Sequence, residues 1–349
     1  MTDASHTPTR HPRRGLVLPF IIVGVLLAAW TGWWFFLVRQ VETQLDVQVE
    51  RLRQDGWTIT HATPATTGWP FRARVSIPHA SFLAPSGHGV AAPELIAEAN
   101  AYNPDRWVVI APDGLTLTRP DKGKVGIDGD GLRLSVSHLR QRFPDLRVEM
   151  VRPTFTAHQD AEPFPIASAE RVLLNVRPHV NGGDETTDAM DVAFELADAR
   201  GRPGGPVEGA TRQGRLTARL EGTVQNASRL AGIDSAGVFS AWTAAGGRFT
   251  DIRGELAAGD SRARIESDGL AAAPDGRLQG QVSLRAERPM AAIAGLAGSR
   301  SGAVDRAGAA GAAVAAGAEG GEGVDLVIQF RDGRTWLGPF ALAPAPKLF

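Results

Sequence analysis

The sequence predicts a mainly β protein. We expect a curved antiparallel sheet, a meander with few short helices, preceded by one N-terminal transmembrane helix and an amphipathic juxtamembrane helix. Three observations lead to this fold class: an uncharged apolar run over residues 15–38, period-two alternation of apolar and polar side chains through most of the chain beyond residue 57, and the 40 glycines and 23 prolines that supply turns. One-sided alternation is typical of antiparallel sheets with one apolar and one polar face.

Composition excludes several classes of function. The 349 residues contain 37 basic and 38 acidic side chains, so net charge gives no reason to expect nucleic acid as a partner. The chain has no cysteine, which excludes disulfides, thiolate metal sites and cysteine nucleophiles.

The transmembrane helix is predicted from GLVLPFIIVGVLLAAWTGWWFFLV, residues 15–38, which contains no charged residue. At about 1.5 Å per residue this run is long enough to cross roughly 30 Å of hydrocarbon. Trp30, Trp33 and Trp34 stand near its far end, where we expect them at the membrane interface. The alternatives are a buried core helix and a cleaved signal peptide. Because bulky WWFF stands where a small-residue cleavage site belongs, we interpret the run as an uncleaved signal anchor.

The orientation of this anchor in the membrane does not follow from the count of charged residues alone. Arginines stand on both sides of the run, three before it and three after it: Arg10, Arg13, Arg14, Arg39, Arg51 and Arg53. Residues 1–14 look like the basic region of a signal, and long C-terminal domains translocate largely regardless of charge. We therefore expect residues 1–14 to be a short cytoplasmic tail. The protein would be a single-pass protein of the bacterial inner membrane with the bulk of the chain in the periplasm, and the bilayer is its first expected partner.

Residues 39–56 are predicted to form the amphipathic juxtamembrane helix. Val41, Leu45, Val49 and Leu52 recur at helical spacing, and charged residues occupy the rest of the turn. Gly56 stands where a helix commonly ends in a left-handed residue.

Residues 57–298 are expected to form a periplasmic β-rich domain, and residues 324–349 its closing strands. Short helices are predicted near residues 234–245 and 289–298. Residues 299–323 are rich in alanine and glycine, and each glycine costs a helix about 1 kcal/mol relative to alanine, so a flexible linker or insertion is predicted there. A membrane β-barrel would also alternate, but an uncleaved inner-membrane anchor and a single tyrosine disfavour it.

The first long strand is predicted in GWPFRARVSIP, residues 68–78. Period two places Trp69, Phe71, Ala73, Val75 and Ile77 on one side of it. Two interpretations stay open for this apolar row. It is either ordinary core or the entrance of a lipid groove close to the bilayer, and the lipid-groove candidates are Trp69, Phe71, Val75 and Ile77.

The search for catalytic and metal-binding motifs predicts neither kind of site. The eight histidines are scattered without HExxH or short paired spacing, and IDGDGLRL lacks the ligands of an EF-hand. Nucleophile-elbow, phosphate-loop and dinucleotide motifs are absent from the sequence. We predict no catalytic residues, no metal and no cofactor, and expect that the protein is not an enzyme. A carboxylate pair for glycoside hydrolysis is the remaining enzymatic alternative.

Several short segments carry a family resemblance. The anchor and amphipathic helix, followed by DGWTI, GWPFR, AYNPDRWVVIAP and FRDGRTWLGPFALAPAP, resemble a family of bacterial envelope proteins catalogued as domain of unknown function 2125. That family in turn looks like a shorter relative of the AsmA-like envelope proteins, whose repeated strands are thought to form a groove for lipid. The resemblance implies a membrane-anchored, β-rich envelope protein.

Two non-enzymatic functions are therefore expected from the sequence. The first is a lipid-binding or lipid-handling module of the cell envelope, with a phospholipid or other envelope lipid as its partner. The alternative is a structural or assembly scaffold that binds other envelope proteins through a sheet edge. The few helices available to cover the apolar face favour an open groove, although a sheet folded onto itself would cover that face equally well.

Overall fold

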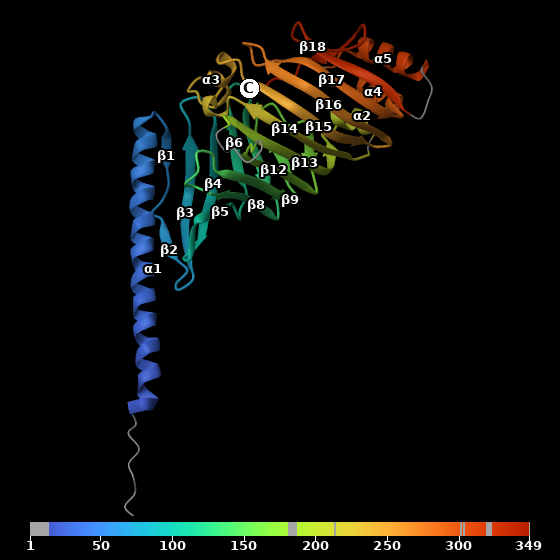
Figure 1. Ribbon diagram of the computed structural model, residues 1–349. Coiled ribbons are helices and arrows are strands. Elements are labelled where there is room, and N and C mark those ends of the chain that lie inside the picture. The colour runs from blue at the N-terminus through green and yellow to red at the C-terminus, as the bar shows by residue number, and fades with distance from the viewer. Residues whose placement is uncertain are drawn as a thin grey trace, which may run out of the picture.

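The computed structural model, drawn in Figure 1, describes residues 14–180, 187–212, 214–300, 302, 304–318 and 323–348. Apart from Arg14, the predicted cytoplasmic tail lies outside these residues. The described part is mostly β, with one large antiparallel sheet and an N-terminal apolar helix, which confirms the predicted fold class.

The N-terminal helix α1 extends over Arg14–Gln54. The predicted anchor and juxtamembrane helix are one continuous element, because residues 33–55 contain neither glycine nor proline to interrupt it. Within it, Phe20–Gln54 is long enough and apolar enough to cross a membrane. Gly56, with φ of +88°, ends the helix as predicted, and the N–H of Trp57 donates to the carbonyl of Leu52 at 2.9 Å.

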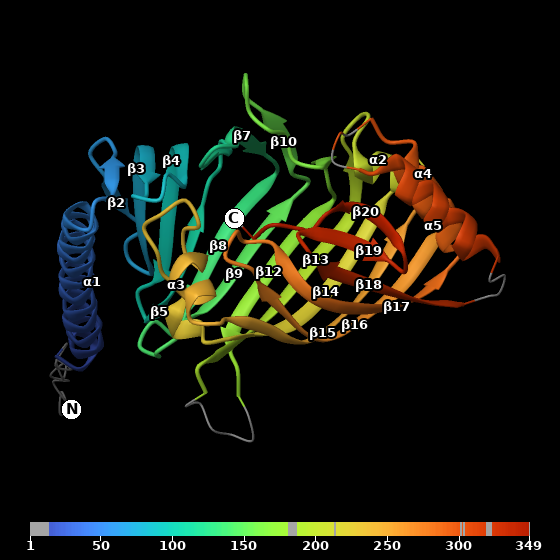
Figure 2. The ribbon, with the colours of Figure 1, turned by 90° about the horizontal axis from the view of Figure 1, so that it is seen from above.

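The main path of the sheet follows neighbouring strands across the molecule (Figure 2). Two short edge strands, β1 (Thr58–Thr60) and β2 (Ala65–Thr67), pair with β3. The path then continues, in order of pairing, through β3 (Arg72–Leu83), β4 (Gly89–Asn100), β5 (Asn103–Ile110), β8 (Gly131–Ser137), β9 (Asp145–Val151), β12 (Arg171–Pro178), β13 (Ala189–Gly201), β14 (Leu216–Gln225), β15 (Arg248–Ala258), β16 (Ser261–Ala272), β17 (Leu278–Glu287), β18 (Val324–Arg331), β19 (Arg334–Leu337) and β20 (Phe340–Pro344).

A second path links β4 to β13 through four further strands: β6 (Leu115–Arg119), β7 (Gly123–Asp128), β10 (Thr154–Ala157) and β11 (Ile166–Ser168). The two paths enclose a core in which Ala92, Ile127 and Leu132 are buried against Met150 and Phe155. Part of the sheet therefore folds over itself and covers some of its own apolar side chains. This is the alternative to an open groove that the sequence left open.

Strand register sorts side chains onto two faces, because residues directly opposite each other in an antiparallel pair point to the same side. One face, called here the apolar face, carries a continuous line of apolar residues and one glycine across twelve strands. This central row consists of Val75, Ala97, Val109, Leu134, Val148, Leu174, Phe194, Leu220, Gly254, Ile265, Leu284 and Leu326.

The opposite face, called here the polar face, carries charge in the neighbouring register. One of its rows consists of Arg133, Glu149, Leu173, Glu195, Arg219, Glu255, Arg264, Arg285 and Asp325. Apart from Leu173, every member is charged. The alternation seen in single strands thus extends across the whole width of the sheet.

Helices lie at the two ends of this sheet (Figure 2). At one end α1 contacts β1 and β3. At the other end lie α2 (Pro206–Thr211), α4 (Pro289–Ala297) and α5 (Arg306–Ala318), and α4 contacts β16 while α5 contacts β20. The short elements η1 (Ala227–Arg229) and α3 (Phe239–Ala244) follow β14, and the indole of fully buried Trp242 donates to the carbonyl of Gln225 at 2.6 Å.

Helix α5 corrects the prediction of a flexible linker over residues 299–323. Ala309, Ala312, Ala313 and Ala316 are buried on one side of it, in a cluster that includes Leu337 and Leu342. Alanine favours helix, and packing against β19 and β20 offsets the cost of the helical glycines. Residues 301, 303 and 319–322 of the predicted linker lie outside the described part of the chain.

Candidate functional site

An open cleft lies between α1 and the first strands of the sheet. This proximal cleft has a volume of about 740 Å³. Its apolar lining comes from both sides, with Leu37, Val41 and Leu45 on α1 and Val75 and Ala97 on the sheet. The α1 side also carries a polar strip at helical spacing, consisting of Gln40, Gln44 and Gln48. The cleft therefore combines an apolar interior with hydrogen-bonding glutamines, and its lining also includes the charged residues Asp105 and Arg140.

The structure separates the four lipid-groove candidates into two pairs. Val75 and Ile77 line the proximal cleft and belong to a buried cluster with Ala80, against which Val41 and Leu45 pack; Val75 is only 2 % exposed. Trp69 and Phe71 precede β3 in its connection from β2, and both are exposed, Phe71 at 64 %. The first pair thus combines features of both interpretations, core and cleft wall, whereas the second pair faces away from the packed interior.

The three tryptophans predicted at the membrane interface hold the sheet to α1. The indole N–H of Trp30 donates to the carbonyl of Pro70 at 2.8 Å, and that of Trp34 donates to the carbonyl of Arg72 at 2.8 Å. The indole of Trp33 lies 3.5 Å from the carbonyl of Ala101. These contacts fix where the proximal cleft lies along the helix. Their placement at a membrane interface stays a prediction.

The central row leads out of the proximal cleft onto the middle of the apolar face. Val75 and Ala97 line the cleft, and the following members lie beyond the principal contacts of α1. Leu134 is 36 % exposed, and Val148, Leu174 and Leu220 are half-buried. A fully packed core would bury these side chains almost completely, so this stretch of the row remains accessible to an apolar ligand.

The row ends in a second hollow beneath α2 and α4. This distal cavity has a volume of about 280 Å³. Leu284 and Leu326, the last two members of the central row, line it together with Ile293 and Leu296 of α4. Apart from Ser261 and Arg262, every side chain in its lining is apolar. The central row therefore connects an open apolar cleft at one end with an apolar cavity at the other.

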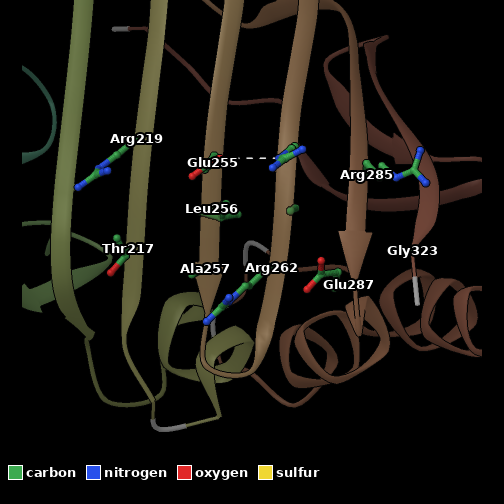
Figure 3. A pocket seen from close by; sticks show the side chains of 11 residues that line it. Thr217, Arg219, Glu255, Leu256, Ala257, Arg262, Arg285, Glu287 and Gly323 are labelled. Atoms are coloured by element: carbon green, nitrogen blue, oxygen red, sulfur yellow. Dashed lines mark ion pairs between the residues drawn. The ribbon is translucent and has the colours of Figure 1, made fainter. Parts of the chain in front are cut away.

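The polar face has hollows of a different character, and Figure 3 shows one of about 730 Å³. Arg219, Glu255 and Arg285 project there from β14, β15 and β17, and Arg262 lies near the strand ends. Its charges pair across strands, as in the 3.7 Å contact between Arg264 and Glu255. Exposed pairs of this kind are typical of a solvated sheet face.

Titratable groups in the described ranges do not gather into a metal site. These ranges contain no group of three or more His, Asp or Glu side chains suited to hold an ion. Histidines pair singly with polar neighbours, as His138 does with Asp145 at 2.8 Å and His179 with Asp191 at 2.7 Å.

Sequence reasoning reached the first member of the central row but not the row itself. The alternation in each strand predicts which side chains share a face within that strand. It does not predict which residue of β9 lies opposite which residue of β12. The glutamine strip of α1 was missed too, although Gln40, Gln44 and Gln48 stand four residues apart and are readable as one helix side.

Comparison with known proteins gives one match. The family model described as "Uncharacterized protein conserved in bacteria (DUF2125)" matches residues 34–346. No curated protein and no solved structure matches the chain. The matched range begins inside α1 and includes all the described strands, and hence the residues of the proximal cleft, the central row and the distal cavity except Trp33. The chain belongs to the bacterial family DUF2125.

Proposed function

We propose that this protein is a membrane-anchored, non-enzymatic lipid-binding module of the bacterial cell envelope. The α1 helix holds it in the inner membrane, and the sheet stands in the periplasm. The apolar face takes up the acyl chains of a phospholipid or another envelope lipid. The observation that carries this proposal is the unbroken central row, which links the proximal cleft to the distal cavity without a charged residue.

The dimensions of the row suit extended hydrocarbon. Neighbouring strands lie about 4.8 Å apart, so twelve strands give a path of roughly 50 Å. Each buried methylene contributes about 0.8 kcal/mol, which makes a row of half-buried leucine, valine and phenylalanine side chains an adequate surface for an acyl chain. Charged side chains, which would have to lose water on contact with hydrocarbon, occupy the opposite face.

Two further features support lipid over a protein partner bound through a sheet edge. The edge strands are short, three residues each in β1 and β2 and five in β20, and short edges limit strand addition. The resemblance to AsmA-like envelope proteins, whose strands are thought to form a lipid groove, is in accord with this choice.

Photo-crosslinking at two adjacent positions of β12 tests the proposal. A photoreactive amino acid replaces Leu174, on the central row, or Asn175, on the polar face, in the full-length protein in cells. We expect mass spectrometry of the irradiated, purified protein to find lipid attached at position 174 and not at position 175. Equal attachment at both positions, or attachment of protein alone at position 174, would contradict lipid binding on the apolar face.

A substitution in the proximal cleft tests whether lipid enters there. In Gln44→Trp the indole fills cleft volume, and we expect several-fold less lipid attached at position 174 with an unchanged thermal midpoint. Thr43→Trp adds the same side chain at an exposed neighbouring position outside the cleft lining and is expected to leave attachment unchanged. Equal loss in both variants would mean that the cleft is not the entrance.

A further inference from the structure

Four aromatic side chains from three separate segments are exposed at one end of the sheet. They are Trp33 of α1, Trp69 and Phe71 of the β2–β3 connection, and Tyr102 of the β4–β5 turn, called here the aromatic tip. Tyr102 is the only tyrosine of the chain and is 70 % exposed. An exposed aromatic cluster is costly in water and marks a surface that meets another phase or partner.

Hydrogen bonds place the aromatic tip along α1. The indoles of Trp30 and Trp34 donate to the carbonyls of Pro70 and Arg72, which flank Phe71. The tip is therefore level with residues 30–34 of the helix. Figure 1 shows the same arrangement, with the lower ends of β2 and β3 beside the middle of α1 and far from its N-terminal end.

The length of the apolar run then fixes the depth of the tip. From Gly15, the first residue after Arg14, fifteen residues lead to Trp30, a rise of about 22 Å. The hydrocarbon layer is roughly 30 Å thick, so a helix that enters it at Gly15 leaves it only at about residue 35. The aromatic tip, level with residues 30–34, thus lies at the boundary of the hydrocarbon, and any tilt of the helix places it deeper.

The backbone of the tip is suited to this environment because its polar groups are paired internally. The N–H of Ala101 donates to the carbonyl of Phe71 at 2.9 Å, and the N–H of Arg72 donates to the carbonyl of Gly68 at 2.9 Å. The carbonyls of Pro70 and Arg72 accept from tryptophan indoles. Pairing of this kind removes most of the penalty that irregular backbone meets at membrane depth.

Charged side chains follow immediately above the tip. Arg39, the first charged residue of α1 after the apolar run, is exposed. Arg72 and Arg74, on the strand that rises from the tip, share Glu98 at 3.7 and 3.3 Å and remain largely exposed. Arginine beside interfacial aromatics is suited to phosphate groups of lipid heads. The order of chemistry along the molecule, apolar, aromatic and then basic, matches the order of layers in a bilayer.

We propose that the aromatic tip inserts into the bilayer interface on the side of the domain, as a second membrane contact beside α1. This contact holds the sheet at a fixed height and places the proximal cleft, which Trp33 lines, at the level of the lipid head groups. It does not depend on lipid binding by the apolar face. Lipid crosslinking at position 174 can fail although the tip is inserted, and it can succeed although the tip lies in water.

Fluorescence at a single introduced cysteine tests the insertion, since the chain has no cysteine of its own. Full-length Phe71→Cys is labelled with the environment-sensitive dye NBD and reconstituted in vesicles of phosphatidylethanolamine and phosphatidylglycerol. The matched control is Leu83→Cys, at the end of β3 far from position 71 and also exposed. The twelve residue steps from position 71 to position 83 correspond to about 40 Å. Dye at position 71 is expected to emit further to the blue and to be quenched by doxyl-labelled lipid, whereas dye at position 83 is quenched by aqueous iodide.

Two outcomes would overturn the proposal. Dye at position 71 that behaves like dye at position 83 places the tip in water. Dye at position 71 that neither doxyl-labelled lipid nor iodide quenches is covered by protein. If this shielding is lost when the protein is diluted in lipid, a second copy of the chain covers the tip. Tyr102→Cys, on a different turn, repeats the measurement independently, and an unchanged thermal midpoint confirms that each labelled variant is folded.

Discussion

The two ends of the apolar face are covered by helices of opposite character. At the proximal end, α1 meets the sheet through large side chains such as Trp34 and Leu37 and leaves a cleft of about 740 Å³. At the distal end, α5 packs through alanines, α4 packs through Ile293 and Leu296, and the hollow left beneath these helices is about 280 Å³. The difference teaches that small contact residues let helices pack closely and leave a small hollow, whereas large ones leave a larger cleft.

The distal end shows how small residues allow this close packing. A side chain at Gly295 of α4 would meet the backbone of Gly209, and one at Gly308 of α5 would meet the backbone of Ala341. Glycine at these positions lets backbone approach backbone. At the proximal end the bulky indoles of Trp30 and Trp34 lie between helix and sheet and donate to the carbonyls of Pro70 and Arg72.

The largest expected effect comes from placing charge in the proximal wall. Val75→Asp buries a carboxylate between α1 and β3, where Val75 is 2 % exposed, and should lower the free energy of unfolding by about 4 kcal/mol. Val327→Asp, the same change at an exposed position of β18, should cost less than about 1 kcal/mol. Thermal and denaturant unfolding of the detergent-solubilised protein measure both. A small loss at position 75 would show that water fills the cleft down to its wall.

The close packing at the distal end is tested by enlarging a contact residue. Gly295→Val forces α4 away from Gly209 and should lower the free energy of unfolding by about 3 kcal/mol. Gly298→Ala, at the residue that caps the end of α4 and with only an ordinary contact 3.5 Å away, should change it by less than about 0.5 kcal/mol. The same denaturant titration compares the two variants. If Gly295→Val is as stable as the parent, the distal helices are not held by backbone contact.

One contribution to the dependence of stability on pH should come from His88, which lies outside both covering layers. Burial, followed by the nearby charge of Lys122, lowers the pKa of His88, which lies against Gly237 and Ser86. A lowered pKa in the folded state means that the unfolded chain binds the proton more readily. Stability contributed by neutral His88 is therefore complete above the unfolded pKa of about 6.5 and is lost as pH falls through the folded value.

The measurement compares unfolding free energies at about pH 7.5 and about pH 5. His88→Gln should reduce the loss of unfolding free energy between these two pH values. It should leave the packing of the helices at both ends of the apolar face unchanged. An identical loss in parent and variant would assign the pH dependence to other groups.

The smallest effect is expected on the polar face. Glu255→Gln breaks an exposed pair with Arg264 and should cost at most about 0.5 kcal/mol in denaturant unfolding. Arg264→Gln should give the same small value. A loss of several kcal/mol in either variant would mean that this face is covered in the intact protein rather than solvated, which would remove the distinction between the two faces.

Local patterns were sufficient for the elements that depend on local physics. The uncharged run and its amphipathic continuation predict α1, and Gly56 predicts its end, because helix geometry is set by neighbours three and four residues away. The alternation of single strands predicts a sheet with two unlike faces for the same reason. The helix predicted at residues 289–298 corresponds to α4, over Pro289–Ala297.

Helix α5 shows where local reasoning fails. Its glycines indicate flexibility when residues 299–323 are considered alone, and the prediction of a linker over Arg306–Ala318 is wrong because Leu337, Phe340 and Leu342 cover the alanine side of the helix. These partners stand on later strands, so the stabilising contact does not exist in the segment itself.

By itself the sequence determined the kinds of element, their two-faced character and the apolar run that could anchor the chain. The tertiary structure alone decided what lies next to what. Val75 and Leu326, the ends of the central row, are joined only through the register of eleven successive strand pairs, and the aromatic tip unites residues from α1 and two separate turns. The physical reason is that strand pairing is non-local. A shift of one residue in any pair would move its side chains to the other face, and that choice depends on the packed sheet as a whole.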